Sequence, residues 1–312
     1  MSSAESADRV DRVDTAGAAE LFMRERPRLL GLSYRLLGAV ADAEDVVQET
    51  WLRFERTDRS TIERPEAWLT TVCGRIGLDH LRARQRLQVD YVGPWLPEPI
   101  GERLDEDPVA TAELSDSLTT SFLLLLERLR PEERLALLMV DVFGEPFSAV
   151  ADALGKTEPA CRQLTARARK KLRHDPPLGP TDSVPAATAI ARLLVRAVLG
   201  GDLDAVRSLL APDVVLISDG GAATHAARRP VRFPDRVARF LVNVNRKRLP
   251  WLPEITFSEI LLNGSPGFLA TDPNGRPVLA QSVDVVDDRV VRIHIIANVE
   301  KLAVLDRDIR IR

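Results

Sequence analysis

The sequence predicts a multidomain protein in which two all-α helical domains precede one α+β domain. Three observations predict this order. Apolar residues recur at helical spacing through the first half of the chain, prolines gather in two short stretches, and the last part contains several β-rich segments. A chain of 312 residues is long enough for two to three domains. We therefore expect a disordered tail over 1–17, a helical domain over 18–90, a linker over 91–113, a second helical domain over 114–175, a linker over 176–185 and the α+β domain over 186–312.

The composition is typical of a globular protein, with 45% apolar and 29% charged residues. The formal net charge of −3 hides an uneven distribution of charge, so it does not exclude a nucleic-acid partner. Cys73 and Cys161 lie inside helical patterns far apart in the chain, which favours buried free thiols in a reducing cytoplasm. No segment is apolar enough for a membrane span or a signal peptide. We therefore expect a cytoplasmic protein with no membrane contact, no metal and no cofactor.

The first helical domain is organised around a helix over residues 42–54. Its apolar residues recur at helical spacing and predict a buried stripe, which consists of Ala43, Val46, Val47, Thr50, Trp51 and Phe54. The opposite face is polar and carries Asp42, Asp45, Gln48, Glu49 and Arg53. We expect Asp42 to cap the helix and Asp45 to lie in its positive first turn. A solvated acidic face and a partner-binding face are both compatible with this pattern.

The next helix, from Pro65 to about Gln85, carries arginines along one ridge. These are Arg75, Arg82, Arg84 and Arg86. Guanidinium groups attract phosphates and can stack on exposed bases, so the ridge predicts contact with nucleic acid. Trp68 is either an aromatic platform for a base or, more commonly at such a position, part of the core.

Residues 91–113 cannot continue a helix because Pro94, Pro97 and Pro99 interrupt them. One interpretation is a spacer that the prolines keep extended. The pentapeptide at 94–98, which contains Trp95, recurs at 250–254 with Trp251. The repeat reflects either a coincidence of loop chemistry or two copies that dock alternately in one pocket.

Residues 114–175 follow the pattern helix, helix, turn, helix. A short helix closes at Gly155, residues 156–159 form the turn, and 160–173 are the candidate recognition helix. Seven basic residues and one acidic residue lie between Lys156 and Arg173. The side chains predicted to face a major groove or its phosphates are Arg162, Gln163, Thr165, Arg167 and Lys171. A solvated basic helix is the other interpretation.

The last domain begins with short helices and ends in a curved antiparallel sheet. The expected elements are helices over 186–199, 202–210 and 234–248, and strands over 213–219, 254–262, 267–271, 278–286 and 289–297. Asp219, His225, Asp284 and His294 are the candidates for an acid or base if this domain is catalytic. The string Asp219-Gly220-Gly221 is also compatible with a simple turn after a strand.

The segments 34–38, 42–54 and 64–69, in this order, resemble domain 2 of the extracytoplasmic-function sigma factors. The string Cys161–Leu164 with Arg167–Arg169 resembles sigma domain 4. The resemblance implies that Asp42, Asp45, Gln48, Glu49 and Arg53 bind the clamp of core RNA polymerase. It implies that Trp68, Arg75, Arg82, Arg84 and Arg86 act at the promoter −10 element, and Arg162, Gln163, Arg167 and Lys171 at the −35 element. The polymerase flap is a further implied contact, and the linker is implied to thread a polymerase channel.

The linker string 93–99, the Asp219-Gly220-Gly221 loop and the string Asn298–Leu302 resemble the sigma subgroup with a fused SnoaL-like domain. This implies regulation in cis through Trp95, Asp219, Gly220, Gly221, Asn298 and Lys301, with the last domain contacting both sigma domains. The expected protein is a promoter-specificity factor and not an enzyme. Two alternatives are a ligand-sensing helix-turn-helix regulator that acts without polymerase, and an enzyme fused to a DNA-binding module.

Overall fold

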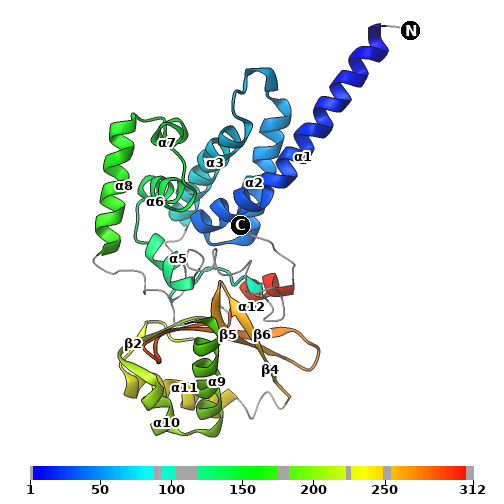
Figure 1. Ribbon diagram of the computed structural model, residues 1–312. Helices are drawn as coiled ribbons and strands as arrows, with labels where there is room; N and C mark the ends of the chain where they lie inside the picture. Colours follow the sequence, from blue (N-terminus) through cyan, green and yellow to red (C-terminus); the bar gives the residue numbers. More distant parts are fainter. Residues whose placement is uncertain are drawn as a thin grey trace. The chain divides into compact units, whose positions relative to one another are not determined.

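The computed structural model describes residues 3–87, 91, 93–102, 119–173, 183–222, 226–248 and 254–306. Side chains are described from residue 17 onward, except those of 85–87, 102, 248 and 306. The chain divides into two compact units, whose elements are labelled in Figure 1. The helical unit comprises Met1–Arg86 and Leu129–Lys171, and the sheet unit comprises Leu87–Arg128 and Leu172–Ile309.

The helical unit begins with three helices and a short 3₁₀ turn. They are α1 (Ser3–Leu37), α2 (Val40–Arg56), η1 (Arg59–Thr61) and α3 (Pro65–Leu87). Gly38 ends α1 in the left-handed region, with φ of 68°. The sequence predicted an unstructured tail over 1–17, whereas α1 begins at Ser3. Residues 3–17 contain no proline and only one glycine, so a helix that packs from Ala18 onward can extend back through them.

The helix-turn-helix completes the helical unit. Its elements are α6 (Pro131–Leu137), the π-helical segment η3 (Leu138–Val142), α7 (Phe147–Leu154) and α8 (Glu158–Arg173). Gly155 closes α7 with φ of 62°, a left-handed conformation that suits glycine. The predicted start of the recognition helix at residue 160 is two residues late, because α8 begins at Glu158. Pro159 lies in the first turn, where a missing N–H costs no helical hydrogen bond.

α3 and α6 approach closely at Gly74. A Cβ atom there would lie 3.2 Å from Leu135 Cδ1 and 3.5 Å from Met139 Sδ. Cys73 and Cys161 are both buried and free, as predicted. Burial raises the pKa of the Cys73 thiol to about 11.

The sheet unit contains one mixed sheet in the order β1-β4-β5-β6-β7-β2-β3. The strands are β1 (Gly101–Glu102), β2 (Leu210–Asp219), β3 (Val231–Arg232), β4 (Thr256–Leu262), β5 (Ser265–Thr271), β6 (Pro277–Val286) and β7 (Arg289–Ile296). The helices are α5 (Thr120–Leu126), α9 (Val184–Gly200), α10 (Leu203–Leu209), α11 (Pro234–Arg248) and α12 (Val299–Leu302), followed by the 3₁₀ turn η5 (Ala303–Asp306). The expectation of a wholly antiparallel sheet is wrong, because β7 returns beside β2 in parallel. The segment between them contains α11 and the four strands β3 to β6, which is long enough for such a crossover.

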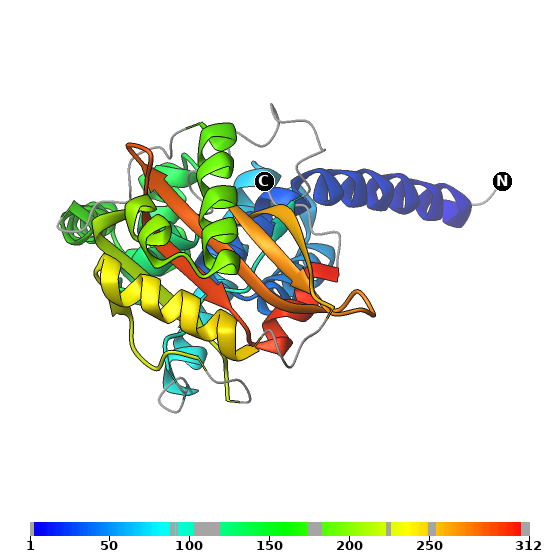
Figure 2. The same ribbon diagram turned by 90° about the horizontal axis from the view of Figure 1, so that it is seen from below.

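The two faces of this sheet carry different side chains, since successive residues of a strand point to opposite faces. Val283, Val285 and Ile293 pack with residues of α9, α10 and α11 in the main core. Figure 2 shows α9 (green) and α11 (yellow) crossing the strands on this face. The opposite face packs against the linker: Ile296 forms a second core with Leu96. Among the described residues, no helix has the length and apolar character needed to cross a membrane.

The linker-facing side contains an isolated buried histidine. His294 lies opposite Ile217 of β2 and Ser282 of β6, and its side chain is 2% exposed. Neither ring nitrogen has a hydrogen-bond partner among the described residues. Burial, opposed by the nearby charge of Asp284, lowers the pKa of His294 below its ordinary value of 6.5.

We predict that His294 makes the unfolding free energy dependent on pH below 6.5. Above pH 6.5 the imidazole is neutral in both states. As the pH falls below 6.5, the unfolded chain binds a proton that the folded chain does not, so stability decreases by up to about 1.4 kcal/mol per pH unit. Urea unfolding of His294→Leu should show a shallower decrease, and the partly exposed His80→Leu variant is the control. Parallel curves for wild type and His294→Leu would contradict the prediction.

Candidate functional site

The predicted buried stripe of α2 is confirmed except at Trp51, which is half-buried, and it leaves the polar residues on the opposite side. Asp45, Gln48 and Arg53 are exposed, whereas Asp42 and Glu49 are half-buried. The prediction that Asp42 caps the helix is wrong, because α2 begins earlier, with Ala39 as its N-cap. Asp42 lies in the first turn instead, where the helix dipole stabilises a carboxylate.

The polar face of α2 combines paired charges with an exposed apolar residue. Arg53 donates to Glu49 over 2.6 Å, and His80 Nε2 lies 3.8 Å from the same carboxylate. Leu52, beside them, is 39% exposed. A charged rim around an apolar side chain is typical of a protein-binding surface.

Two of the predicted −10 arginines contact the helix-turn-helix within the helical unit. Arg75 Nη2 donates to the carbonyl oxygen of Asp152 over 2.6 Å. Arg82 Nη2 donates to Glu132 over 2.7 Å, and its Nη1 lies 3.4 Å from Asp79. Arg84 is half-buried, and the side chain of Arg86 lies outside the described residues.

Trp68 belongs to an aromatic cluster rather than standing clear of the helix. Its ring centroid lies 5.6 Å from that of Phe54, at an interplanar angle of 45°. Trp51 packs on Phe22 with centroids 4.9 Å apart and extends the same cluster. Trp68 is therefore partly buried against the core, which limits its freedom to stack on a base.

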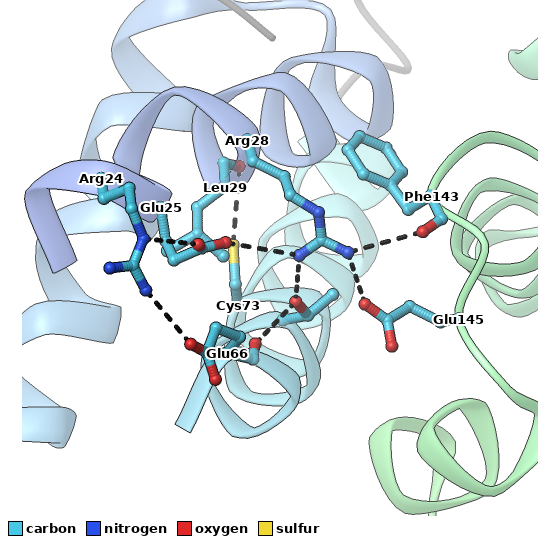
Figure 3. A network of polar contacts seen from close by, with 9 residues as sticks. Arg24, Glu25, Arg28, Leu29, Glu66, Cys73, Phe143 and Glu145 are labelled. Carbon is cyan, nitrogen blue, oxygen red and sulfur yellow. Dashed lines mark hydrogen bonds and ion pairs between the residues drawn. The ribbon is translucent and has the colours of Figure 1, made fainter. Parts of the chain in front are cut away.

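A polar network centred on Arg28, drawn in Figure 3, was not predicted from the sequence. Arg28 Nη1 donates to Thr70 Oγ1 of α3 over 2.6 Å. Its Nη2 donates to Glu145 Oε1 over 2.5 Å, and its guanidinium lies 5.6 Å from the ring centroid of Phe143. The planar guanidinium thus links α1 and α3 to the loop after η3. Only the folded structure reveals these contacts, because Thr70 and Glu145 are both far from Arg28 in the sequence.

A second arginine contact lies deeper in the same interface. Arg134 Nη2 of α6 donates to the carbonyl oxygen of Arg35 over 2.9 Å. The Arg35 guanidinium lies 5.4 Å from the Phe143 ring centroid, and burial lowers its pKa to about 10. Arg35 therefore stays charged at neutral pH, and its position over the ring suits a cation–π contact.

The recognition helix presents most of the predicted side chains to solvent. Arg162, Gln163, Arg167 and Lys171 are exposed. Arg162 pairs with Glu158 over 2.7 Å and Lys171 with Glu133 over 2.6 Å. Among the described residues, Arg167 has no hydrogen bond or ion pair.

The prediction that Thr165 faces the groove is wrong. Thr165 is fully buried and donates to the carbonyl oxygen of Cys161 over 3.2 Å. At 3.6 residues per turn it lies on the same side as Cys161 and Ala168, which are also buried.

In the sheet unit, Asp219 at the end of β2 is the acceptor of a buried cluster. Its Oδ1 accepts from Tyr91 Oη over 2.6 Å and from the Gly221 N–H over 3.0 Å. Its Oδ2 accepts from the Leu96 N–H over 2.9 Å and from Lys301 Nζ over 2.7 Å. The carboxylate therefore joins the linker to α12 through hydrogen bonds from four donors.

Lys301 contacts the linker as well as the carboxylate. Its Nζ donates to the Leu96 carbonyl oxygen over 2.5 Å. The same ammonium lies 4.5 Å from the ring centroid of Trp95 and 5.1 Å from that of Tyr91. An ammonium between two aromatic faces and a carboxylate is well compensated for its loss of water.

The predicted regulatory residues therefore lie together around the linker. Gly221 has φ of 59°, and a Cβ there would lie 2.7 Å from Asn298 Nδ2, so glycine suits both the backbone and the close approach. Gly220 precedes it and is buried. Asn298 caps α12 by accepting from the Glu300 N–H and donates to Tyr91 Oη over 3.2 Å.

Sequence analysis also missed Asn263, which holds the end of the linker. Asn263 Oδ1 accepts from the Ile100 N–H over 2.9 Å, and the Asn263 N–H donates back to the Ile100 carbonyl oxygen over 2.8 Å. Gly101 then pairs with Leu262 at the edge of β4. Asn263 has φ of 50°, and the Asn-Gly pair at 263–264 was a turn signal that indicated a hairpin but not its partner. The second copy of the pentapeptide, with Trp251, lies outside the described residues.

The candidate acids and bases are not arranged around the apolar cavity of the sheet unit. This cavity of about 180 Å³ lies toward α9 and α11, and Asn245 and Gln281 are the only polar residues among its described lining. Asp219, Asp284 and His294 point to the opposite face of the sheet. Ser121 and Ser265 both donate to the Asp284 carboxylate. His225 lies outside the described residues.

Comparisons with known proteins agree with this geometry. Residues 21–87 match the family Sigma-70 region 2, and residues 119–172 match Sigma-70 region 4. The ECF RNA polymerase sigma factor SigJ of Mycobacterium tuberculosis is 43% identical over 232 residues, which cover 74% of this chain and 74% of that protein.

Solved structures extend the likeness beyond the helical regions. The crystal structure of Mycobacterium tuberculosis SigJ covers 91% of this chain and 98% of its own, with a TM-score of 0.72 and 37% identity. A SnoaL-like protein from Burkholderia thailandensis covers 37% of this chain and 96% of its own, with a TM-score of 0.28 and 21% identity. The likeness to SigJ confirms the predicted order of two sigma helical regions followed by an α+β domain.

These findings favour a polymerase-dependent factor over a regulator that acts without polymerase. A factor of this kind binds core RNA polymerase and directs it to promoter DNA. The chain belongs to the ECF RNA polymerase sigma factors.

Proposed function

We propose that the polar face of α2 binds the clamp of core polymerase. The residues assigned to this contact are Asp42, Asp45, Gln48, Glu49 and Arg53. The exposed Leu52 and the pre-arranged Glu49–Arg53 pair support this assignment, because they combine apolar area with fixed charges on one helix face. The flap is the corresponding partner for region 4. The chain acts where the polymerase is, in the cytoplasm, without membrane contact or catalysis of its own.

The promoter contacts belong to two basic faces. Trp68, Arg75, Arg82, Arg84 and Arg86 act at the −10 element, and Arg162, Gln163, Arg167 and Lys171 act at the −35 element. The exposure of the α8 side chains supports the second assignment. The pairing of Arg75 and Arg82 with α7 and α6 means that these contacts must open before either arginine reaches DNA. The exposed Arg82–Glu132 ion pair contributes only about 0–1 kcal/mol, and the Arg75 contact is one exposed hydrogen bond, so promoter phosphates can replace both.

The SnoaL-like domain regulates the sigma regions in cis by holding the linker. The observation that carries this proposal is the Asp219–Lys301 pair, which closes on the backbone of Leu96 from both sides. Leu96 is fully buried in a core with Ile296 and Leu302. A docked linker cannot at the same time thread a polymerase channel, so its release and docking are two states that transcription can distinguish.

The clamp assignment is tested by reversing one exposed charge. Asp45→Lys should weaken binding to core polymerase by about ten-fold or more, because a fixed negative charge at the interface becomes positive. Surface plasmon resonance with immobilised core measures the effect. Glu20→Lys is the control, since Glu20 is an exposed acid on α1 outside the proposed face. Equal losses in both variants would argue against the assignment.

The −35 assignment is tested with two arginines on one helix. Arg167→Ala should reduce promoter binding by holoenzyme roughly 5- to 100-fold, the range expected when a base or phosphate contact is lost. Arg169→Ala should have a smaller effect, because its guanidinium already makes two hydrogen bonds to Asp141, at 2.9 and 2.5 Å. Binding is measured on promoters with an intact and a scrambled −35 element. An effect of Arg167→Ala that is the same on both promoters would refute sequence-specific contact.

Control in cis is tested by removing the charge of Asp219. Asp219→Asn leaves Lys301 buried without its counter-ion, a change that typically costs about 3–5 kcal/mol, so the linker should be released. We expect faster proteolysis near residues 91–101 and altered transcript output, with core binding retained. Asp213→Asn, an exposed carboxylate on the same strand, is the matched control.

A chain that ends at Pro180 provides a second measure of the same control. It should also change promoter output while still binding core. Output that is unchanged both in this chain and in Asp219→Asn would refute control in cis.

A further inference from the structure

A second cavity in the sheet unit lies on the linker-facing side of the sheet, under α5. Its volume is about 300 Å³, at the lower end of the range for ligand sites. Ser121 of α5 and Arg128 after it line one wall, and Arg232, Arg292 and His294 line the sheet side. The apolar cavity near α9 and α11 shares none of these residues.

The strand register places two of these arginines in one row. Arg232 of β3 and Arg292 of β7 are both paired with Val215 of β2, one on each side of it. Residues directly opposite in neighbouring strands point to the same face, so the two guanidinium groups flank the same part of the cavity. Arg128 adds a third positive charge from the α5 side.

The facing acidic group does not cancel this charge. Asp284 of β6 is paired with Arg292 in the register, and it is 2% exposed. Its Oδ1 accepts from Ser265 Oγ over 3.0 Å, and its Oδ2 accepts from Ser121 Oγ. Arg232 and Arg292 with this one carboxylate therefore leave the sheet side of the cavity with net positive charge, which suits an anion.

His294 gives the cavity an unused polar group. It lines the cavity at 2% exposure, and both its ring nitrogens lack a hydrogen-bond partner among the described residues. A buried polar atom without a partner is unfavourable, so the empty state carries a penalty that a ligand would remove. A neutral imidazole offers one N–H donor and one acceptor.

We propose that this cavity binds the oxyanion group of a small ligand, a carboxylate or a phosphate, through Arg292, Arg232 and the N–H of His294. The planar guanidinium groups match the geometry of either oxyanion. Because Ser121 and Arg128 belong to the part of the chain that matches region 4, a bound anion would tie α5 to the sheet. The link between α5 and the sheet matters for regulation only if the proposed control in cis holds. The binding of the anion does not depend on that proposal.

Binding is tested on the full-length protein with inorganic phosphate and with acetate, at ionic strength held constant with sodium chloride. A saturable rise in melting temperature and a calorimetric isotherm are expected for at least one of the two anions. The anion that binds identifies the ligand class: phosphate alone, carboxylate alone, or oxyanions in general. Arg292→Gln should weaken that binding at least about ten-fold. Arg239→Gln, an exposed arginine on α11 away from the cavity, should bind as wild type does.

A separate readout follows the imidazole itself. In protein labelled with ¹⁵N-histidine, saturating anion should shift the ring nitrogen signals of one of the four histidines, the one that is absent in His294→Leu. The proposal is overturned if neither anion binds above the chloride control. It is also overturned if Arg292→Gln and His294→Leu both bind as wild type does, or if the shifted histidine is not His294. Because core binding and transcription are not measured, failure here leaves the proposed sigma function untouched.

Discussion

The arrangement of the sheet unit depends on the buried carboxylate of Asp219. Transfer of an ion from water into a protein interior costs several kcal/mol unless its lone pairs are used. Here four donors use them: Tyr91 Oη, the Leu96 and Gly221 N–H groups, and Lys301 Nζ. Two of the four come from the linker, so the hydrogen bonds to this carboxylate are complete only while the linker is docked. A single side chain therefore connects the position of the linker to the stability of the domain.

This dependence explains why the compact units do not follow the family regions. Region 4 matches residues 119–172, yet α5 belongs to the sheet unit while α6, α7 and most of α8 belong to the helical unit. Asn263 contacts both the linker at Ile100 and α5 at Thr120 Oγ1, over 3.2 Å. In the helical unit, Arg28 and Arg134 join region 2 to the helix-turn-helix. Regions 2 and 4 thus contact each other within the helical unit.

Features that depend on residues close together in the sequence could be predicted from the sequence. The stripe of α2, the boundaries of α11 and the exposed face of α8 follow from helical periodicity, and the helix-turn-helix follows from Gly155 and the local charge. Finer local choices were wrong: Asp42 does not cap, because the helix could begin earlier, and Thr165 turns inward. The linker contacts could not be derived, because Tyr91 and Leu96 lie more than a hundred residues from Asp219. The charge or apolar character of a residue indicates that it can form an ion pair or pack in a core. It does not identify which distant residue will be its partner.

The most direct test of the docked linker is amide hydrogen exchange of the free full-length protein, resolved at Leu96 and Ile100. Both N–H groups donate to side chains of the SnoaL-like domain, at 2.9 Å in each case. The account predicts slow exchange at these two amides, comparable to that of the central strands β6 and β7. Exchange at the rate of an unstructured peptide would contradict it, since the linker would then not be held by Asp219 and Asn263 in solution.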